Sequence, residues 1–202
     1  SAGQRTENDA AQNQSYNQLN NRIKTTYVKE SISKNKNSLY DSYIKAFRWA
    51  SDRIDDEGIV GFVTPSTWID GNTLMGFRKC IEDEYSSIYI FNLRGNGRTS
   101  GELCRQEGEP LFAAHGGTGG SLLPISITLL IKKKGYTSST KIFYHDIGNY
   151  LKRNKKLEIE ALKIRENILG EEHINTANSY NNLALLYQDK NEYDKALFFY
   201  QK

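Results

Sequence analysis

Apolar residues in the first part of the chain recur at steps of three and four. This spacing places them on one helical face and predicts an amphipathic helix over residues 37–54 and a shorter one over residues 16–27. The spacing is lost in residues 25–37, which are expected to form a loop. Ser38 and Asp41 have the spacing of a capping box at the start of the longer helix. Its inward positions are expected to be Leu39, Tyr43, Phe47, Ala50 and Ile54.

Short apolar runs predict β-strands after this helix. The run at 59–63 is continuous and rich in β-branched residues, which is typical of a strand buried on both faces. A further amphipathic helix over 72–84 allows the strands on either side of it to be parallel. A strand buried on both faces needs a neighbouring strand at each of its edges. Nothing before residue 38 resembles a strand, so that part of the sequence supplies no such neighbour for strand 59–63. The other predicted strands are 86–93, 125–135 and 141–147.

The order of these elements indicates an α/β fold. Helices and strands alternate up to residue 93, a long glycine-rich stretch comes next, and two more strands come after it. Such an order implies one sheet with helices on its faces. From residue 157 to the end the strand pattern stops and only helical spacing remains.

Composition and charge exclude several classes of protein. The net charge of +3 permits contact with nucleic acid without requiring it. No apolar run approaches the roughly 20 residues that span a bilayer, and the first residues lack the apolar core of a signal peptide. Cys80 and Cys104 are too few for a disulfide framework, which favours a reducing, cytoplasmic compartment. The histidines lie far apart without other ligands at metal spacing, so no metal site is predicted.

Three arginines come after the strand at 86–93. Arg94, Arg98 and Arg105 lie among small and polar residues, in the kind of loop where α/β folds bind ligands. Arginine side chains there suit phosphates or base edges, so these three are candidate nucleic-acid-binding residues. A solvated basic loop with no ligand is the competing interpretation.

Four segments resemble the methyltransferase region of large single-chain restriction–modification enzymes of the type ISP kind. In that family a nuclease, a translocase, an adenine-specific DNA methyltransferase and a target-recognition region share one polypeptide. The resemblance extends over about residues 1–156. In chain order, the segments are NSLYDSYIKAFRWASDRI, GIVGFVTPSTWIDG, IYIFNLRGNGRTSGE and KIFYHDIGNYLKR.

The resemblance implies a partial sheet and an incomplete site. "SAGQ" at the start is similar to the residues directly after the family's Asn-Pro-Pro-Tyr motif, which holds the flipped adenine, so Ser1, Ala2, Gly3 and Gln4 would be a remnant of the base pocket. What remains of the sheet would resemble strands five to seven of a Rossmann-like methyltransferase and their helices. The family uses S-adenosylmethionine, but without the cofactor-binding half this chain is expected neither to bind it nor to transfer methyl. DNA is the partner that the resemblance implies.

Residues 157–202 resemble a tetratricopeptide repeat of the kinesin-light-chain kind. Large and small residues alternate at the positions that pack two antiparallel helices, and about one and a half repeats are present. A helical hairpin of no particular family is the alternative. By the resemblance, the inner, peptide-binding face would consist of Asn178, Asn181, Leu185, Gln188 and Asp189.

The sequence therefore predicts two domains, at residues 1–156, of which 1–14 are expected to be disordered, and at residues 157–202. A single helix is expected to cross the join without a flexible linker. Three functions remain open: a DNA adenine methyltransferase fragment that is inactive alone, a protein-binding module that uses the repeat, or a fusion without function.

Overall fold

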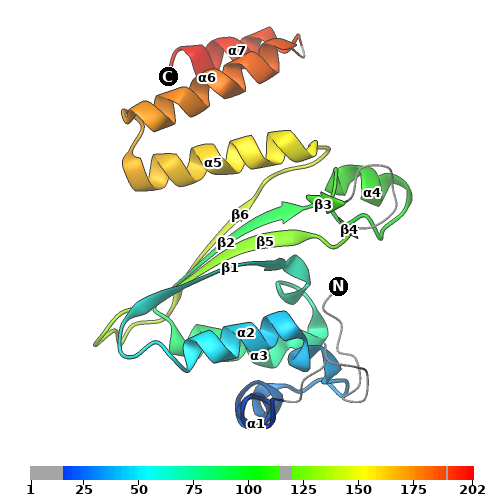
Figure 1. The fold of residues 1–202 in the computed structure, drawn as a ribbon, viewed down its shortest axis with the longest axis vertical. Helices are drawn as coiled ribbons and strands as arrows, with labels where there is room; N and C mark the ends of the chain where they lie inside the picture. Colours follow the sequence, from blue (N-terminus) through cyan, green and yellow to red (C-terminus); the bar gives the residue numbers. More distant parts are fainter. Residues whose placement is uncertain (1–15, 114–119, 190) are drawn as a thin grey trace. The chain divides into compact units, whose positions relative to one another are not determined.

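The computed structural model describes residues 16–113, 120–189 and 191–202 (Figure 1). The chain forms two compact units. The first contains the residues up to Asn92 together with Leu123–His145, and the second contains Leu93–Leu122 together with Asp146–Lys202. Each unit has a hydrophobic cluster of its own.

A four-stranded mixed sheet underlies the first unit. The strands lie in the order β1-β5-β2-β6. β1 and β5 are antiparallel, with Gly58 opposite Lys132 and Pro65 opposite Ile125. Predicted strands are therefore confirmed, but β1 and β2 are not neighbours, because β5 lies between them. The bounds are Gly58–Pro65 for β1, Ser87–Arg94 for β2, Ile125–Lys132 for β5 and Lys141–Asp146 for β6.

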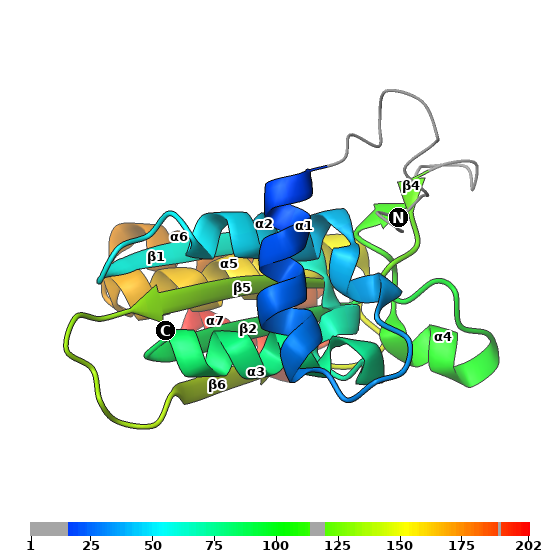
Figure 2. The same ribbon diagram turned by 90° about the horizontal axis from the view of Figure 1, so that it is seen from below.

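Helices of the first unit pack on one face of this sheet. α2 and α3 lie against the sheet, and α1 crosses beneath them (Figures 1 and 2). The chain enters α2 and α3 through short 3-10 turns at Asn37–Tyr40 and Asn72–Leu74, and a third such turn, Ser66–Trp68, comes after β1. The bounds are Asn17–Ile23 for α1, Ser42–Ser51 for α2 and Met75–Glu84 for α3.

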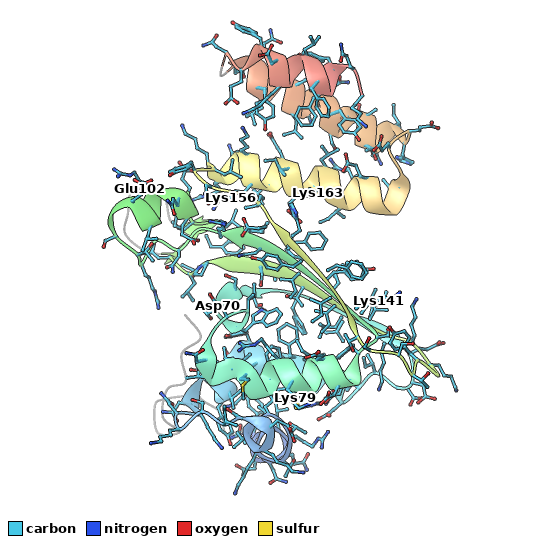
Figure 3. All side chains as sticks on the ribbon, turned by 180° about the vertical axis from the view of Figure 1, so that it is seen from behind. Asp70, Lys79, Glu102, Lys141, Lys156 and Lys163 are labelled. Atoms are coloured by element: carbon cyan, nitrogen blue, oxygen red, sulfur yellow. The ribbon has the colours of Figure 1, made fainter. Side chains whose placement is uncertain are left out.

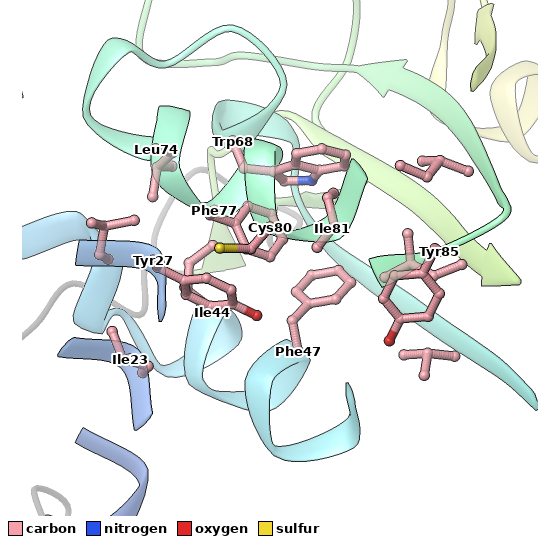
Figure 4. Packing of buried hydrophobic residues seen from close by; sticks show 14 of the residues in the cluster. Ile23, Tyr27, Ile44, Phe47, Trp68, Leu74, Phe77, Cys80, Ile81 and Tyr85 are labelled. Atoms are coloured by element: carbon pink, nitrogen blue, oxygen red, sulfur yellow. The ribbon is translucent and has the colours of Figure 1, made fainter. Parts of the chain in front are cut away.

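Aromatic side chains fill the space between helices and sheet (Figure 4). The ring of Phe47 lies 4.8 Å from that of Phe62 on β1 and 5.2 Å from that of Phe77 on α3. Trp68 meets Phe77 edge-on at 5.5 Å, and Tyr27 does so at 5.2 Å. Edge-to-face pairs of this kind add to the burial of apolar area, so this cluster holds the first unit together.

Three predictions for the first unit need correction. Strand 59–63 was expected to be buried on both faces, yet Ile59 and Val63 are 68% and 57% exposed while Val60 is 5% exposed. The reason is that the helices of this unit cover only the face that carries Val60. The capping box is also wrong, because Asp41, not Ser38, precedes the first residue of α2, and its side chain makes no capping hydrogen bond.

The third correction concerns residues 25–37, where a loop was predicted. α1 continues there as a π-helical turn, Lys24–Val28, and helical conformation extends to Glu30. The hydroxyl groups of Thr25 and Thr26 donate to the Arg22 carbonyl at 3.1 and 2.7 Å. Such bonds from side chain to backbone compete with the regular ladder and widen the helix locally.

A network of charges lies at the end of α2. Arg48, only 3% exposed, holds Glu84 through two hydrogen bonds of 2.6 and 2.9 Å and Asp52 at 2.8 Å. Burial by itself would lower the pKa of Arg48, but the hydrogen bonds and charge of Glu84 outweigh it and raise the pKa. The Asp52 carboxylate also forms an ion pair with Arg22 of α1, with 2.7 Å between Nη2 and Oδ1. This one carboxylate therefore links α1 to the end of α2.

The second unit consists of a loop region and three helices. The loop region contains the short helix α4, Gly101–Glu107, and a two-stranded ladder of β3, Phe112–Ala113, with β4, Gly120–Ser121. The helices are α5, Arg153–Leu169, α6, Ile174–Asp189, and α7, Tyr193–Tyr200. α5 is continuous across residues 156 and 157, as predicted for the join between the two patterns.

The three helices pack through the predicted large and small residues. Of the seven positions in the predicted alternation, Tyr180, Leu183, Ala184, Tyr187 and Ala196 are at most 9% exposed. The other two, Tyr193 and Tyr200, are 62% and 46% exposed, so the prediction that they pack inward is wrong. Asn191, in the turn between α6 and α7, has a φ of 58°, the left-handed conformation that asparagine tolerates better than most residues. Turns at such a position usually contain glycine, and Asn191 keeps the turn in its place.

The contact between α3 and the π-helical turn gives a stability prediction. A Cβ on Gly76 would lie 2.0 Å from the Tyr27 carbonyl oxygen, so Gly76→Ala must push the two helices apart. Overpacking costs about 1–3 kcal/mol, which exceeds the gain of about 1 kcal/mol from replacing a helical glycine. We expect a lower urea midpoint by circular dichroism. The exposed Lys79→Ala on the same helix serves as control, and an unchanged Gly76→Ala midpoint would contradict the tight contact.

Candidate functional site

The arginine loop, residues 94–110, comes after β2 and belongs to the second unit. Arg94, the last residue of β2, has a φ of 54°, which is uncommon for any residue but glycine. Its Nε donates to the Asp146 carboxylate at 2.7 Å, and its Nη1 donates to the Asn149 side chain at 2.5 Å. The Arg94 guanidinium therefore joins the end of β2 to the end of β6 and to the segment that follows it, and is engaged within the protein.

The other two arginines differ in their surroundings. Arg105 on α4 donates to Glu102 through Nε at 2.9 Å and Nη2 at 2.5 Å, while Tyr150 donates to the same carboxylate at 2.7 Å. Arg98 is exposed, and no acidic residue of the described chain forms an ion pair with it. Of the three predicted nucleic-acid-binding residues, Arg98 has the guanidinium best placed to meet a phosphate.

Backbone contacts fix the arginine loop to the start of α5. The Glu107 carbonyl accepts from the Gly95 N–H at 3.0 Å and from the Lys156 ammonium at 2.7 Å. The Glu109 N–H donates to the Leu151 carbonyl at 3.0 Å. At Gly108, with a φ of 69°, a Cβ would lie 2.3 Å from the Leu151 carbonyl oxygen. This position therefore requires glycine, and the loop is held rigidly at both ends.

Lys156 is a buried, titratable residue that the sequence analysis did not single out. Its side chain is fully buried at the start of α5, near the helix α4 that carries Glu102 (Figure 3). Burial lowers the pKa of Lys156 from 10.5 to about 8, and the nearby Glu107 carboxylate offsets part of that shift. It lies in a run of basic residues, and no pattern in the sequence marks which of the lysines turns inward.

The predicted inner face of the repeat lies along α6. Asn178, Asn181, Leu185, Gln188 and Asp189 are all exposed, and Leu185 is 52% exposed. Gln188 accepts a hydrogen bond from the Tyr200 hydroxyl at 3.0 Å, so it also braces α6 against α7. An exposed leucine among amide side chains is suited to an extended peptide, whose backbone amides bond while its side chains pack.

A cation–aromatic contact braces the other side of the same helices. The Lys155 ammonium lies 3.8 Å from the centre of the Tyr187 ring, and Lys195 of α7 lies 5.4 Å from it. Phe199 stacks on Tyr187 at 5.5 Å. The sequence identified Tyr187 as a packing residue, but not the two lysines that meet its ring.

The remaining predictions concern the first four residues, metal binding and membrane spans. The base-pocket remnant, Ser1, Ala2, Gly3 and Gln4, lies outside the described residues. Within the described ranges, no three His, Cys, Asp or Glu side chains gather as metal ligands would. In the same ranges no helix has both the length and the apolar character to cross a membrane.

The C-terminal segment matches a known family. Residues 156–202 match the family model described as tetratricopeptide repeat. The start of the match agrees with the beginning of the helical pattern in the sequence. No curated protein matches the chain.

Three solved structures share the fold of most of the chain. The first is a nuclease-deletion mutant of the Type ISP restriction–modification enzyme LlaGI in complex with a DNA substrate mimic, with 41% identity and a TM-score of 0.69. The second is the ATP-dependent Type ISP restriction–modification enzyme LlaBIII bound to DNA, with 39% identity and a TM-score of 0.69. The third is DrdV in a DNA complex, with 36% identity and a TM-score of 0.67. The matches cover 79%, 78% and 78% of this chain. The chain spans only 15%, 10% and 15% of those proteins.

The buried lysine generates a pH prediction. The pKa of Lys156 is about 8 in the folded protein and 10.5 in the unfolded chain, so between these values the unfolded state binds more protons. Stability attributable to Lys156 therefore rises as pH increases from about 8 to 10.5 and is constant below. In Lys156→Met this rise should disappear relative to wild type, as measured by urea denaturation across that range. Lys134→Met, at a 72% exposed side chain, is the control; a slope unchanged in Lys156→Met would show that the ammonium is not desolvated.

Proposed function

We propose that residues 16–156 act as part of the DNA-contacting methyltransferase region of a restriction–modification polypeptide. The observation that carries this proposal is the likeness to two Type ISP enzymes, at 39–41% identity over 78–79% of this chain, both solved with DNA or a DNA mimic. Identity at this level over a common fold supports descent from a shared ancestor. The three strands β1, β2 and β5 would then be strands five to seven of the methyltransferase sheet.

The activity that we propose for these residues is contact with DNA. The geometry of the arginine loop favours a contact with the DNA backbone, because one exposed guanidinium bonds phosphate without reading a base. Arg98 would make this contact, and Arg94 and Arg105 would shape the loop around it.

The repeat supports a second candidate function, recognition of an extended peptide. The match of residues 156–202 to the tetratricopeptide repeat favours it. The exposed side chains of Asn178, Asn181 and Leu185 on α6 would form the contact face. One and a half repeats offer little area, since such arrays gain stability and surface from about three or more units.

DNA binding is tested by the salt dependence of affinity. We expect a fluorescein-labelled duplex of random sequence to bind the 202-residue chain, with affinity that falls as salt increases from about 50 to 200 mM. In Arg98→Ala the slope of log affinity against log salt should decrease by about one, because one phosphate contact is lost. Fluorescence anisotropy titrations measure both quantities.

The control removes a cation elsewhere. Lys134→Ala changes the net charge by the same amount at a 72% exposed lysine of the first unit, and its slope should match wild type. Equal decreases in both variants would indicate a general charge effect and contradict a specific role for Arg98. Affinity that does not respond to salt would remove the basis for phosphate contact altogether.

A further inference from the structure

Lys156 keeps a positive charge in the interior of the second unit. Its side chain is fully buried, and its ammonium donates to the Glu107 carbonyl at 2.7 Å. A Cβ on Gly95 would lie 3.3 Å from the Lys156 Nζ, so the main chain of the arginine loop approaches the ammonium closely. A buried cation costs free energy that an apolar side chain of similar size avoids. Stability alone therefore does not explain why a lysine occupies this position.

A continuous series of hydrogen bonds connects this ammonium with Arg98. The Glu107 carbonyl, which accepts from the ammonium, also accepts from the Gly95 N–H at 3.0 Å. The Glu107 carboxylate accepts from the Asn96 N–H at 3.2 Å, and the Asn96 side-chain oxygen accepts from the Arg98 N–H at 3.1 Å. Because these bonds fix three main-chain N–H groups of the arginine loop, the series determines where the Arg98 main chain lies.

Further bonds close the turn that carries Arg98. The Thr99 hydroxyl donates to the Asn96 carbonyl at 2.8 Å, and the Gly97 N–H donates to the Leu122 carbonyl at 3.0 Å. The exposed side chain of Arg98 therefore starts from an ordered main chain. Such a side chain loses less conformational entropy when it binds a phosphate than one on a flexible loop, so this order contributes to affinity.

Charged side chains from the surrounding segments act on the Lys156 ammonium. They are Glu107 of α4, Glu109 shortly after it, Arg94 at the end of β2 and Asp146 at the end of β6. Burial is the largest influence and lowers the pKa of Lys156, as Arg94 also does, while the three carboxylates offset part of this shift; the resulting pKa is about 8. A guanidinium keeps its charge well above this pH, so the lysine is the cation of this group that loses its charge here.

We propose that Lys156 is a positioning residue for the contact with DNA: its ammonium holds the Glu107 main chain and, through Glu107 and Asn96, keeps Arg98 where it meets a phosphate. This inference rests on the proposed contact between Arg98 and DNA and adds the group that controls it. Because Lys156 is fully buried, it acts through the arginine loop and does not touch the DNA itself. Loss of its proton removes a charge-assisted hydrogen bond, which is roughly twice as strong as a neutral one, so the loop is held less firmly and DNA affinity decreases.

A double-mutant cycle tests this role with the fluorescein-labelled duplex of random sequence, at constant salt and at about pH 7, where Lys156 is charged. Lys156→Met removes the ammonium and should weaken binding by roughly threefold to tenfold, the contribution of about one phosphate contact. In the Arg98→Ala background the same substitution should change affinity by less than about twofold, because the contact that Lys156 positions is already absent.

The outcomes of this cycle separate the inference from the proposed function. An effect of Lys156→Met that persists in full in the Arg98→Ala background, or no effect in the wild-type background, would overturn the positioning role while the contact between Arg98 and DNA stands. If Arg98→Ala instead binds with the salt dependence of wild type, the DNA contact and the inference fail together.

The pH profile of DNA affinity is a readout that a merely structural role would not produce. Wild-type affinity should decrease as pH rises through about 8, because the Lys156 ammonium loses its proton and holds the loop less firmly. In Lys156→Met the affinity should be low on both sides of that pH and nearly independent of it. A wild-type profile as flat as that of Lys156→Met would refute the positioning role.

Stability distinguishes positioning from general damage to the fold. Since Lys156→Met replaces a buried cation with an apolar side chain, its urea midpoint at about pH 7 should equal or exceed that of wild type. The amides of Gly95, Asn96 and Arg98 should nevertheless exchange hydrogen faster, because their acceptors are held less firmly. A reduced midpoint, or unchanged exchange at these amides, would contradict the proposal.

Lys155→Met is the matched control. It removes the same charge one position earlier on α5, from an ammonium that lies 3.8 Å from the centre of the Tyr187 ring and not at the Glu107 carbonyl. Circular dichroism melts verify that the variant is folded. Its affinity for the duplex should stay within about twofold of wild type, since salt screens a charge that lies away from the contact. Equal decreases in Lys155→Met and Lys156→Met would show that loss of charge alone weakens binding, and would overturn the proposal.

Discussion

The antiparallel pairing of β1 with β5 is the interaction on which the rest of the structure depends. It joins segments far apart in the sequence, and Ser66 extends it with a 2.8 Å hydrogen bond from its N–H to the Pro124 carbonyl. The residues between them, which include α3, β2 and the arginine loop, must therefore leave and return at the same end of the sheet. The entropy of closing such a loop grows only slowly with its length, so a long excursion is tolerated once the strands have paired. β5 is buried where it lies between β1 and β2, with Leu130 and Thr128 fully inaccessible.

Local patterns in the sequence were sufficient to predict most helices and strands, but not which of them would lie next to one another. Apolar spacing predicted α2, α3 and the three C-terminal helices, because each buries one face against a single layer. The order of strands was not predictable, since an apolar run does not indicate which strand it joins. The same ambiguity affected Ile59 and Val63, which were predicted to be buried but are exposed. A continuous apolar run has the same sequence pattern whether helices cover one face of the strand or both. The π-helical turn depends on where two threonine hydroxyls bond, which propensity does not record.

The candidate sites show a similar division. The sequence located the arginine loop but treated its arginines alike, whereas the fold pairs Arg94 with Asp146, a residue 52 positions away. Local spacing would have suggested the pair of Arg105 with Glu102, three residues apart on α4. Burial of Lys156 depends on the Glu107 carbonyl that receives its ammonium, and that contact exists only in the folded chain. Repeat positions on α6 were more predictable, because the alternation of large and small residues fixes which face packs and leaves the other exposed.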